Sequence, residues 1–91
     1  MNVEVKGKVK GISSIFKSGD KFKKRDLIVV TDDPSYPQTV AIEFVNDNEE
    51  KLDVVEIGQT VSVSCNIRGR EWTNPQGEIK YFLSLSGWKI A

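Results

Sequence analysis

Apolar and polar residues alternate over several stretches of the chain, with the period of two that is typical of β-strands with one buried face. In the first stretch Val3, Val5 and Val9 share one side, and charged residues occupy the other. Five segments show alternation or a run of β-branched residues: 3–10, 23–31, 39–45, 60–70 and 78–90. Turn residues separate these segments, so we expect five strands in a single domain, residues 1–91.

A different pattern lies between the third and fourth expected strands. Asp47 and Glu50 have the spacing of a capping box, Leu52 and Val55 would share an apolar helix face, and Gly58 suits a helix end. We therefore expect one short helix over residues 48–55.

The resulting order, β-β-β-α-β-β, predicts the fold class. It indicates an all-β protein with the five-stranded Greek-key barrel of the OB fold and one short helix between strands 3 and 4. Gly7 and Gly11 would let the first strand bend sharply, as a small closed barrel requires. An SH3-like barrel is the alternative, and the helix favours the OB fold.

Alternation along the fourth expected strand separates core positions from a candidate binding surface. Its inward side carries Val61, Val63, Cys65 and Ile67, and its outward side carries Asn66, Arg68, Arg70 and Trp72. An indole beside guanidinium groups suits single-stranded nucleic acid, because bases stack on aromatic rings while cations hold the phosphates. Alternatively, Trp72 packs across the hairpin on Tyr81 and stabilises the turn. Tyr81 shares a side with Leu83 and Leu85, so we expect it to be the hairpin's inner anchor.

The net charge is zero, yet the charges are unevenly distributed. Residues 1–25 hold eight basic and two acidic side chains, residues 26–59 one basic and nine acidic, and residues 60–91 four basic and two acidic. A neutral protein with this distribution can present one basic face, which sets the local potential. The simpler reading is a soluble protein with uneven charge.

Further candidate nucleic-acid contacts lie outside the fourth strand. They are Lys6, Lys8 and Lys10 on the first strand, Phe16, Lys17, Lys21, Lys23 and Lys24 in or beside the following loop, Tyr36 in a turn, and Lys80. The first-strand lysines have an alternative role as a solvated face that protects the strand from aggregation. The alternative for Tyr36 is packing on the barrel rim. We expect Phe22 to anchor its loop on the core and Trp88 to be structural.

Several function classes are excluded by what the chain lacks. It has no histidine and one cysteine, which removes histidine-based triads, most zinc sites and an internal disulfide. No phosphate-binding glycine loop or nucleophile elbow is present, and turn chemistry explains Asp32 and Asp33 better than a metal site. We expect a non-enzymatic protein without cofactor or metal. With neither a membrane-length apolar run nor a signal sequence, a cytoplasmic location is expected.

Residues 57–81, IGQTVSVSCNIRGREWTNPQGEIKY, resemble the bacterial single-stranded-DNA-binding protein family. The matching residues are Gly58, Val61, Val63, Ile67, Arg68, Arg70, Trp72, Thr73, Gly77 and Tyr81. The chain also resembles short OB-type proteins of bacteria and phage, through Tyr36-Pro37 and Trp88-Lys89-Ile90. Val45 stands where family members often carry an aromatic residue, and the chain resembles a variant without the family's acidic C-terminal tail.

The resemblance implies base stacking by Trp72 and binding of single-stranded DNA without strong sequence preference. It further implies a role in replication, recombination or repair, and a homo-oligomer, dimer or tetramer, of bacterial or phage origin. Two alternatives remain open from the residues: an OB barrel used for protein–protein interaction or assembly, and an RNA-binding OB protein.

Overall fold

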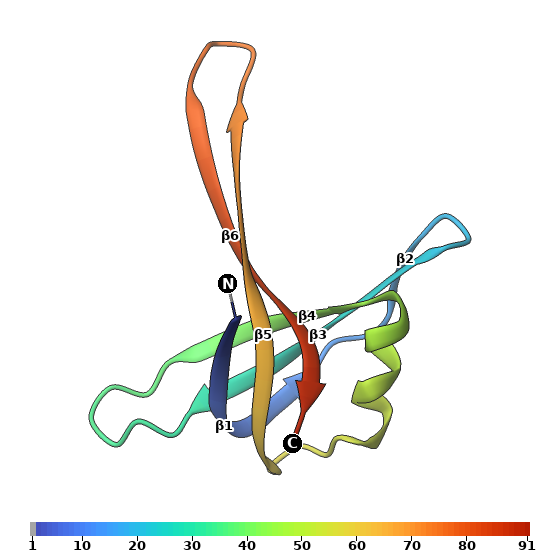
Figure 1. The fold of residues 1–91 in the computed structure, drawn as a ribbon, viewed down its shortest axis with the longest axis vertical. Coiled ribbons are helices and arrows are strands. Elements are labelled where there is room, and N and C mark those ends of the chain that lie inside the picture. Colours follow the sequence, from blue (N-terminus) through green and yellow to red (C-terminus); the bar gives the residue numbers. More distant parts are fainter. Residues whose placement is uncertain (1) are drawn as a thin grey trace.

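The computed structural model describes residues 2–91, which form six strands and one 3₁₀ helix (Figure 1). These elements are β1 (Asn2–Ile12), β2 (Phe16–Ser18), β3 (Phe22–Thr31), β4 (Thr39–Val45), η1 (Asn46–Val54), β5 (Thr60–Thr73) and β6 (Ile79–Ile90). Five of the strands correspond to the expected ones. The short strand β2 lies in the segment expected as a loop or hairpin turn, where it forms a hairpin with β3.

The five long strands close into a ring. Their order is β1-β5-β6-β4-β3, and pairing of β1 with β3 completes the circuit. All pairings are antiparallel except that of β4 with β6, which is parallel and short, joining Ile42 to Leu85 and Glu43 to Ser86. The expected five-stranded OB barrel is confirmed, with its helix between the third and fourth long strands.

The ring closes because β1 pairs with two strands. Its residues 2–8 pair with β5 and its residues 7–12 pair with β3, so the strand must bend near Gly7. A Cβ atom at Gly7 would overlap the backbone carbonyl of Val30, so a larger residue could not make this close approach. The expected role of Gly7 as a bending point is thus supported by its surroundings.

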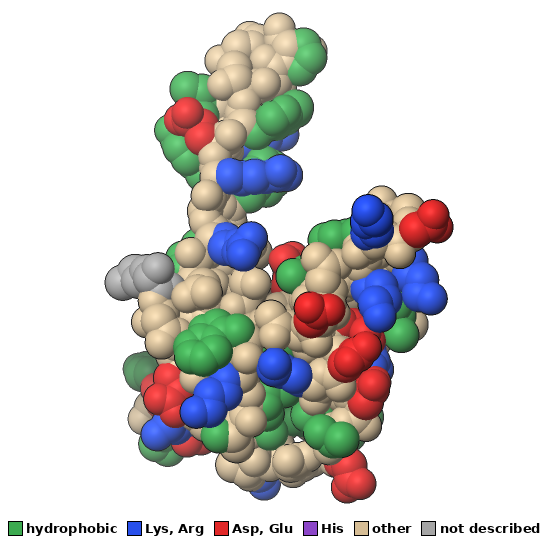
Figure 2. Space-filling view, turned by 45° about the vertical axis from the view of Figure 1, so that its right-hand side comes forward, with side chains coloured by type: hydrophobic (Ala, Val, Ile, Leu, Met, Phe, Trp, Pro, Cys, Tyr) green, Lys and Arg blue, Asp and Glu red, His purple; other side chains and the backbone are tan. Residues whose placement is uncertain are grey.

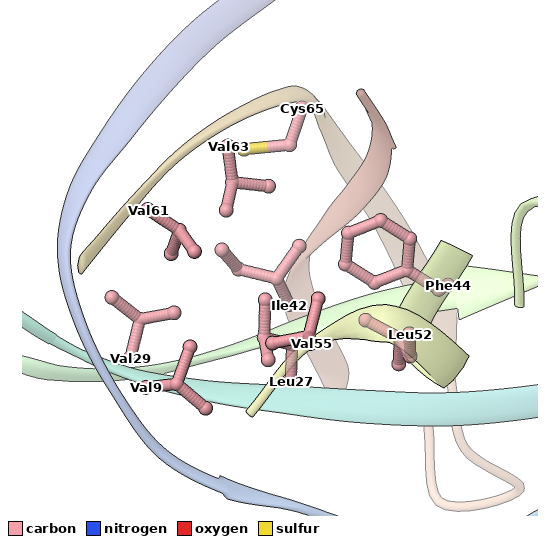
Figure 3. Close-up of a cluster of buried hydrophobic side chains, with 10 residues drawn as sticks. All are labelled: Val9, Leu27, Val29, Ile42, Phe44, Leu52, Val55, Val61, Val63 and Cys65. Carbon is pink, nitrogen blue, oxygen red and sulfur yellow. The ribbon is translucent and has the colours of Figure 1, made fainter. Parts of the chain in front are cut away.

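The core fills the ring from the inward sides of β1, β3, β4 and β5, while β6 adds the partly buried Leu85 and Ile90 (Figure 3). It consists of Val9, Leu27, Val29, Ile42, Phe44, Leu52, Val55, Val61, Val63 and Cys65. Cys65 is fully buried, as the strand alternation predicts. Leu52 and Val55 close one end of the barrel, where η1 lies against Phe44 (Figure 3).

The helix differs from the expected one in type and start. It is a 3₁₀ helix over Asn46–Val54 rather than residues 48–55. The capping box predicted from Asp47 and Glu50 is wrong, because the residue before the helix is Val45 and no side chain caps it. Asn46 instead has a positive φ of 51°, and its side-chain oxygen accepts a hydrogen bond from the Lys23 backbone nitrogen.

The β2–β3 and β5–β6 hairpins project beyond the ring (Figure 1). The first, which we call the β2–β3 arm, comprises residues 16–24. The second, the β5–β6 arm, comprises residues 68–84, beyond the last residues of β5 and β6 that pair with β1 or β4. The strand alternation continues into this second arm although no barrel core remains to receive its inward side.

Gly87 supplies a test of core packing, because a Cβ atom there would overlap the ring of Phe44. We expect Gly87→Ala to lower the free energy of unfolding by about 1–3 kcal/mol through overpacking. Gly69→Ala is the matched control, since its Cβ would meet only the Phe82 carbonyl oxygen, at 3.7 Å. Urea unfolding of both variants measures the effect, and equal stability of the two would contradict this account of the core.

A buried ion pair ties β3 to η1 and supplies a second test. Glu49 is 3% exposed, and its carboxylate lies 3.6 Å from Arg25 Nη1, which also contacts Asp53 at 3.1 Å. Arg25→Met would leave Glu49 buried with only Lys23, 3.9 Å away, and we expect a loss of about 3–5 kcal/mol. Asp53→Asn is the control, since that side chain is 63% exposed and should cost less than about 1 kcal/mol. Chemical denaturation that ranks the two variants equally would refute a structural role for the buried pair.

Candidate nucleic-acid interface

The β5–β6 arm has two chemically different faces. Directly opposed residues of an antiparallel pair share a face, so the register assigns every side chain to one side of the arm. One face carries Arg68, Arg70 and Trp72 from β5 with Ser84, Phe82 and Lys80 from β6. The other carries Gly69, Glu71 and Thr73 with Leu83, Tyr81 and Ile79. We call these the arginine face and the apolar face.

Large aromatic rings on the arginine face are half exposed. Trp72 is 47% and Phe82 is 46% exposed, and the Arg70 guanidinium lies 5.2 Å from the centre of the Phe82 ring. A cation at this distance is attracted to the face of the ring. The stack holds Arg70 in place while leaving its charge at the surface.

The turn at the tip of the arm is rigidly pinned by Asn74. Its side-chain oxygen accepts hydrogen bonds from the backbone nitrogens of Gln76 and Glu78, at 3.1 and 2.8 Å. Its backbone nitrogen donates to the Glu78 carbonyl, and Gly77 takes a φ of 84° that favours glycine. This closed turn fixes the strand register that places Trp72 opposite Lys80.

A hollow of about 550 Å³ lies where the arginine face meets the barrel. Its lining consists of Glu43, Arg68, Gly69, Arg70, Phe82, Leu83 and Ser84. Figure 2 shows a notch between the β5–β6 arm and the β2–β3 arm, with acidic and basic side chains at its base. The two arms therefore flank an open groove over the outer side of the barrel.

The carboxylate of Glu43 in this hollow is neutralised. Lys24 Nζ lies 3.0 Å from Glu43 and 3.9 Å from Asp26. The hydrogen bond to Glu43 raises the pKa of Lys24 above its ordinary value. Lys24, expected as a phosphate contact, is thus engaged by two acids, and its charge offsets theirs at the base of the groove.

The β2–β3 arm keeps part of its expected positive charge. Lys17, Lys21 and Phe16 are exposed, the phenyl ring by 59%. Lys23 instead lies 3.9 Å from the buried Glu49. Phe22, expected as an anchor on the core, is 38% exposed and is not part of the core cluster. It lies opposite Ser18 at the end of the β2–β3 pairing, where no core extends beneath it.

The three lysines of the first strand lie on the outer surface but away from the arm. Lys6, Lys8 and Lys10 are all exposed, and Lys6 is paired with Ser62. The same outward side of β5 continues from Ser62 to Asn66, which is exposed, and then onto the arginine face. The distance along β5 from Ser62 to Arg70 is roughly 26 Å at about 3.3 Å per residue, so one continuous outer side joins the two basic groups.

Tyr36 lies in a different part of the surface. Its loop joins β3 to β4 at the end opposite the β2–β3 arm (Figure 1), and its ring is 76% exposed rather than packed on the barrel rim. The backbone nitrogens of Tyr36 and Ser35 donate to Asp33 Oδ1 at 2.9 and 2.8 Å, which lowers the pKa of Asp33. Asp33 thus shapes the turn, as the sequence indicates.

Two sequence-based expectations at this site need correction. Tyr81 is not an inner anchor: it is 76% exposed, because the hairpin extends past the barrel core formed by the described residues. Trp72 does not pack on Tyr81 either, because Trp72 is opposite Lys80 while Tyr81 lies on the other face. Trp88 sits at an irregularity in the pairing of β6 with β5 and is 40% exposed, so its expected structural role stays a prediction.

Phe82 is the residue that sequence reasoning missed. The sequence did contain a signal, because Phe82 has the opposite parity to Leu83 and Leu85 and therefore shares a side with Lys80. Only the register of the hairpin places it opposite Arg70, and that register depends on the length of the turn.

Residues 2–91 form neither a metal-binding cluster nor a membrane-spanning helix. No group of three or more Cys, Asp or Glu side chains there lies close enough to hold a metal ion. Within the same range, no helix has the length and apolar character needed to cross a membrane.

Comparison with solved structures supports the fold assignment. Rim1, a mitochondrial single-stranded DNA binding protein from S. cerevisiae, superposes with a TM-score of 0.73 at 15% identity, over 100% of this chain and 92% of Rim1. The single-stranded DNA binding protein from Thermus aquaticus gives a TM-score of 0.73 at 17% identity. That match covers 99% of this chain but 48% of the Thermus chain, so this chain spans about half its length. The fold is therefore the OB fold of single-stranded-DNA-binding proteins.

Sequence comparison identifies the family. No curated protein sequence matches the chain. A family model matches residues 4–91, almost the whole sequence. The chain therefore belongs to the family described as domain of unknown function DUF3127.

Proposed function

We propose that this protein binds single-stranded DNA, without strong sequence preference, along the arginine face of the β5–β6 arm. The observation that carries the proposal is the interleaving of two half-exposed rings, Trp72 and Phe82, with Arg68, Arg70 and Lys80 on one face above an open hollow. Bases would stack on the rings while the three cations neutralise phosphates. The fold shared with single-stranded DNA binding proteins supports this assignment.

Other exposed residues would extend the path of the strand. Lys17, Lys21 and Phe16 are exposed on the β2–β3 arm, which lies across the notch, and Asn66 leads from the β5–β6 arm toward Lys6, Lys8 and Lys10. Tyr36 would be reached only by a strand that crosses the barrel. Lys23 and Lys24 contribute less, because each is paired with acidic side chains.

On this proposal the protein binds nucleic acid and is not an enzyme. Single-stranded DNA is exposed during replication, recombination and repair, and we place the activity in these processes. The same face would also accept RNA, since stacking and phosphate contacts do not read the sugar. Titrations with oligo-dT and oligo-U of equal length distinguish the two.

Base stacking on Trp72 can be isolated by removing the second tryptophan with Trp88→Phe. We expect oligo-dT to quench the fluorescence of this single-tryptophan protein at low salt, because a base covers the indole. In the wild-type background, Trp72→Ala should weaken binding by about 1–3 kcal/mol, roughly 5- to 150-fold. Absence of quenching and of binding at low salt would overturn the proposed function. Quenching with unchanged affinity of Trp72→Ala would reject the site alone, and duplex DNA is the control for strand preference.

Phe82 and its stacked arginine provide a second test of the same face. We expect Phe82→Ala to weaken binding of a short oligonucleotide by roughly 5-fold or more, because a stacking platform is lost and Arg70 is released. Tyr81→Ala is the matched control, one residue away on the apolar face. Fluorescence anisotropy measures both, and an equal effect of the two changes would argue against an arginine-face site.

Salt dependence tests the phosphate contacts. Each neutralised phosphate of a single strand contributes about −0.7 to the slope of log K against log salt concentration. Arg68→Gln and Arg70→Gln should each make this slope shallower by about 0.7 when it is measured over the same range of salt concentrations. Lys51→Gln on η1 is the control with an unchanged slope. A slope that is unchanged by both arginine substitutions would exclude these residues from the proposed path of the DNA strand.

A further inference from the structure

The apolar face of the β5–β6 arm is exposed although it continues the inner side of the barrel. Leu83 is 75%, Tyr81 is 76% and Ile79 is 52% exposed. Figure 2 shows hydrophobic and acidic side chains gathered on one side of this arm, and hydrophobic and basic ones on the other. Single exposed apolar residues are common on protein surfaces, but an unbroken row of three large ones indicates an interaction surface.

This face is unsuited to a nucleic acid. Its residues are Gly69, Glu71, Thr73, Ile79, Tyr81 and Leu83, so its charge is the single negative one of Glu71. A base stacked on Tyr81 would bring its phosphates toward that carboxylate, with no cation on the face to compensate. The chemistry fits an apolar protein surface instead.

The arm also lacks support from the rest of the described chain. Pairing of β5 with β1 ends at Asn66, and pairing of β6 with β4 involves only Leu85 and Ser86. Beyond these residues the arm is a two-stranded ribbon, an arrangement that is marginally stable in water without a third strand or a packed face. A covering surface would therefore stabilise the arm as well as bury its apolar row.

We propose that a second copy of this chain covers the apolar face, with the two arms packed face to face about a two-fold axis. All three apolar side chains belong to β6, so each copy offers a narrow stripe of Ile79, Tyr81 and Leu83. A stripe of this kind is self-complementary, as an isologous contact requires. Tyr81 is its middle member and lies on the axis. Glu71 stands on the neighbouring strand, so its carboxylate remains at the solvated rim of the contact.

The size of the stripe sets the expected affinity. A large side chain buries about 150–250 Å², so the exposed parts of three residues supply on the order of 400 Å² per copy. Backbone and partial cover of the neighbouring strand at the rim, where Gly69 and Thr73 flank Glu71, bring the total for two copies near the lower limit of about 1,200 Å² for specific interfaces. We therefore expect a reversible dimer. Both arginine faces point away from the contact and remain open.

Sedimentation velocity from about 1 μM to about 1 mM, the range of weak association, tests the proposal. We expect the mass to double over this range for the wild type and to stay that of one chain for Tyr81→Asp and Leu83→Asp. Circular dichroism checks that these variants fold, and Trp72→Ala on the opposite face should dimerise normally. A wild type that stays monomeric throughout, or a dimer that survives both aspartates, would overturn the proposal.

Disulfide trapping gives a second measurement that does not depend on a disruptive charge. Cys65, the single native cysteine, is buried, and burial raises the pKa of its thiol, so it does not compete. Under mild oxidation Tyr81→Cys should cross-link into a covalent dimer, because two thiols meet at the axis. Lys80→Cys, its neighbour on the arginine face, should stay monomeric. Equal cross-linking of the two variants would exclude a two-fold contact through the apolar face.

Discussion

The extension of the β5–β6 pairing past the barrel is the constraint on which the molecule's surface chemistry depends. Eleven register pairs join these strands, from Val63 with Ile90 to Thr73 with Ile79, while the other neighbours of β5 and β6 end near the middle of this ladder. Successive side chains on a strand point to opposite sides, so both sides of the barrel wall continue into the arm. The outer side becomes a row of cations and rings, and the inner side becomes a row of uncovered apolar residues.

Neutralisation at the barrel end explains how a chain of zero net charge can retain a local basic face. The basic start of β3 contacts the acidic residues that follow it in sequence: Arg25 meets Glu49 and Asp53, and Lys24 meets Glu43. In these pairs, cations of the basic first segment neutralise carboxylates of the acidic middle segment. The arginines of the β5–β6 arm lie outside these contacts, so they dominate the potential of their own face.

Strand alternation predicted most of the barrel because the core depends on local side-chain parity. Cys65, Val63 and Val61 were assigned inward from their spacing alone, and all three are buried. The same logic failed at Tyr81, because parity says which side a residue faces but not where the barrel beneath it ends. The core ends where the pairing of β5 with β1 and of β6 with β4 ends, and these pairings join residues that are far apart in the sequence. Phe82 escaped notice for a related reason, since its partner Arg70 is fixed by hairpin register.

The two faces of the arm therefore have different consequences for binding. A half-exposed ring such as Trp72, which lies opposite Lys80, can stack on a base without first leaving a packed site, so little conformational rearrangement opposes binding. The apolar face, in contrast, is stabilised when it is covered, because contact removes its row of apolar side chains from water and gives the two-stranded ribbon a packed face. Covering one face leaves the other unobstructed, since the two are back to back on the same strands. An arm dimer would then hold two arginine faces at a fixed separation, and a strand long enough to reach both would bind the second at a raised effective concentration.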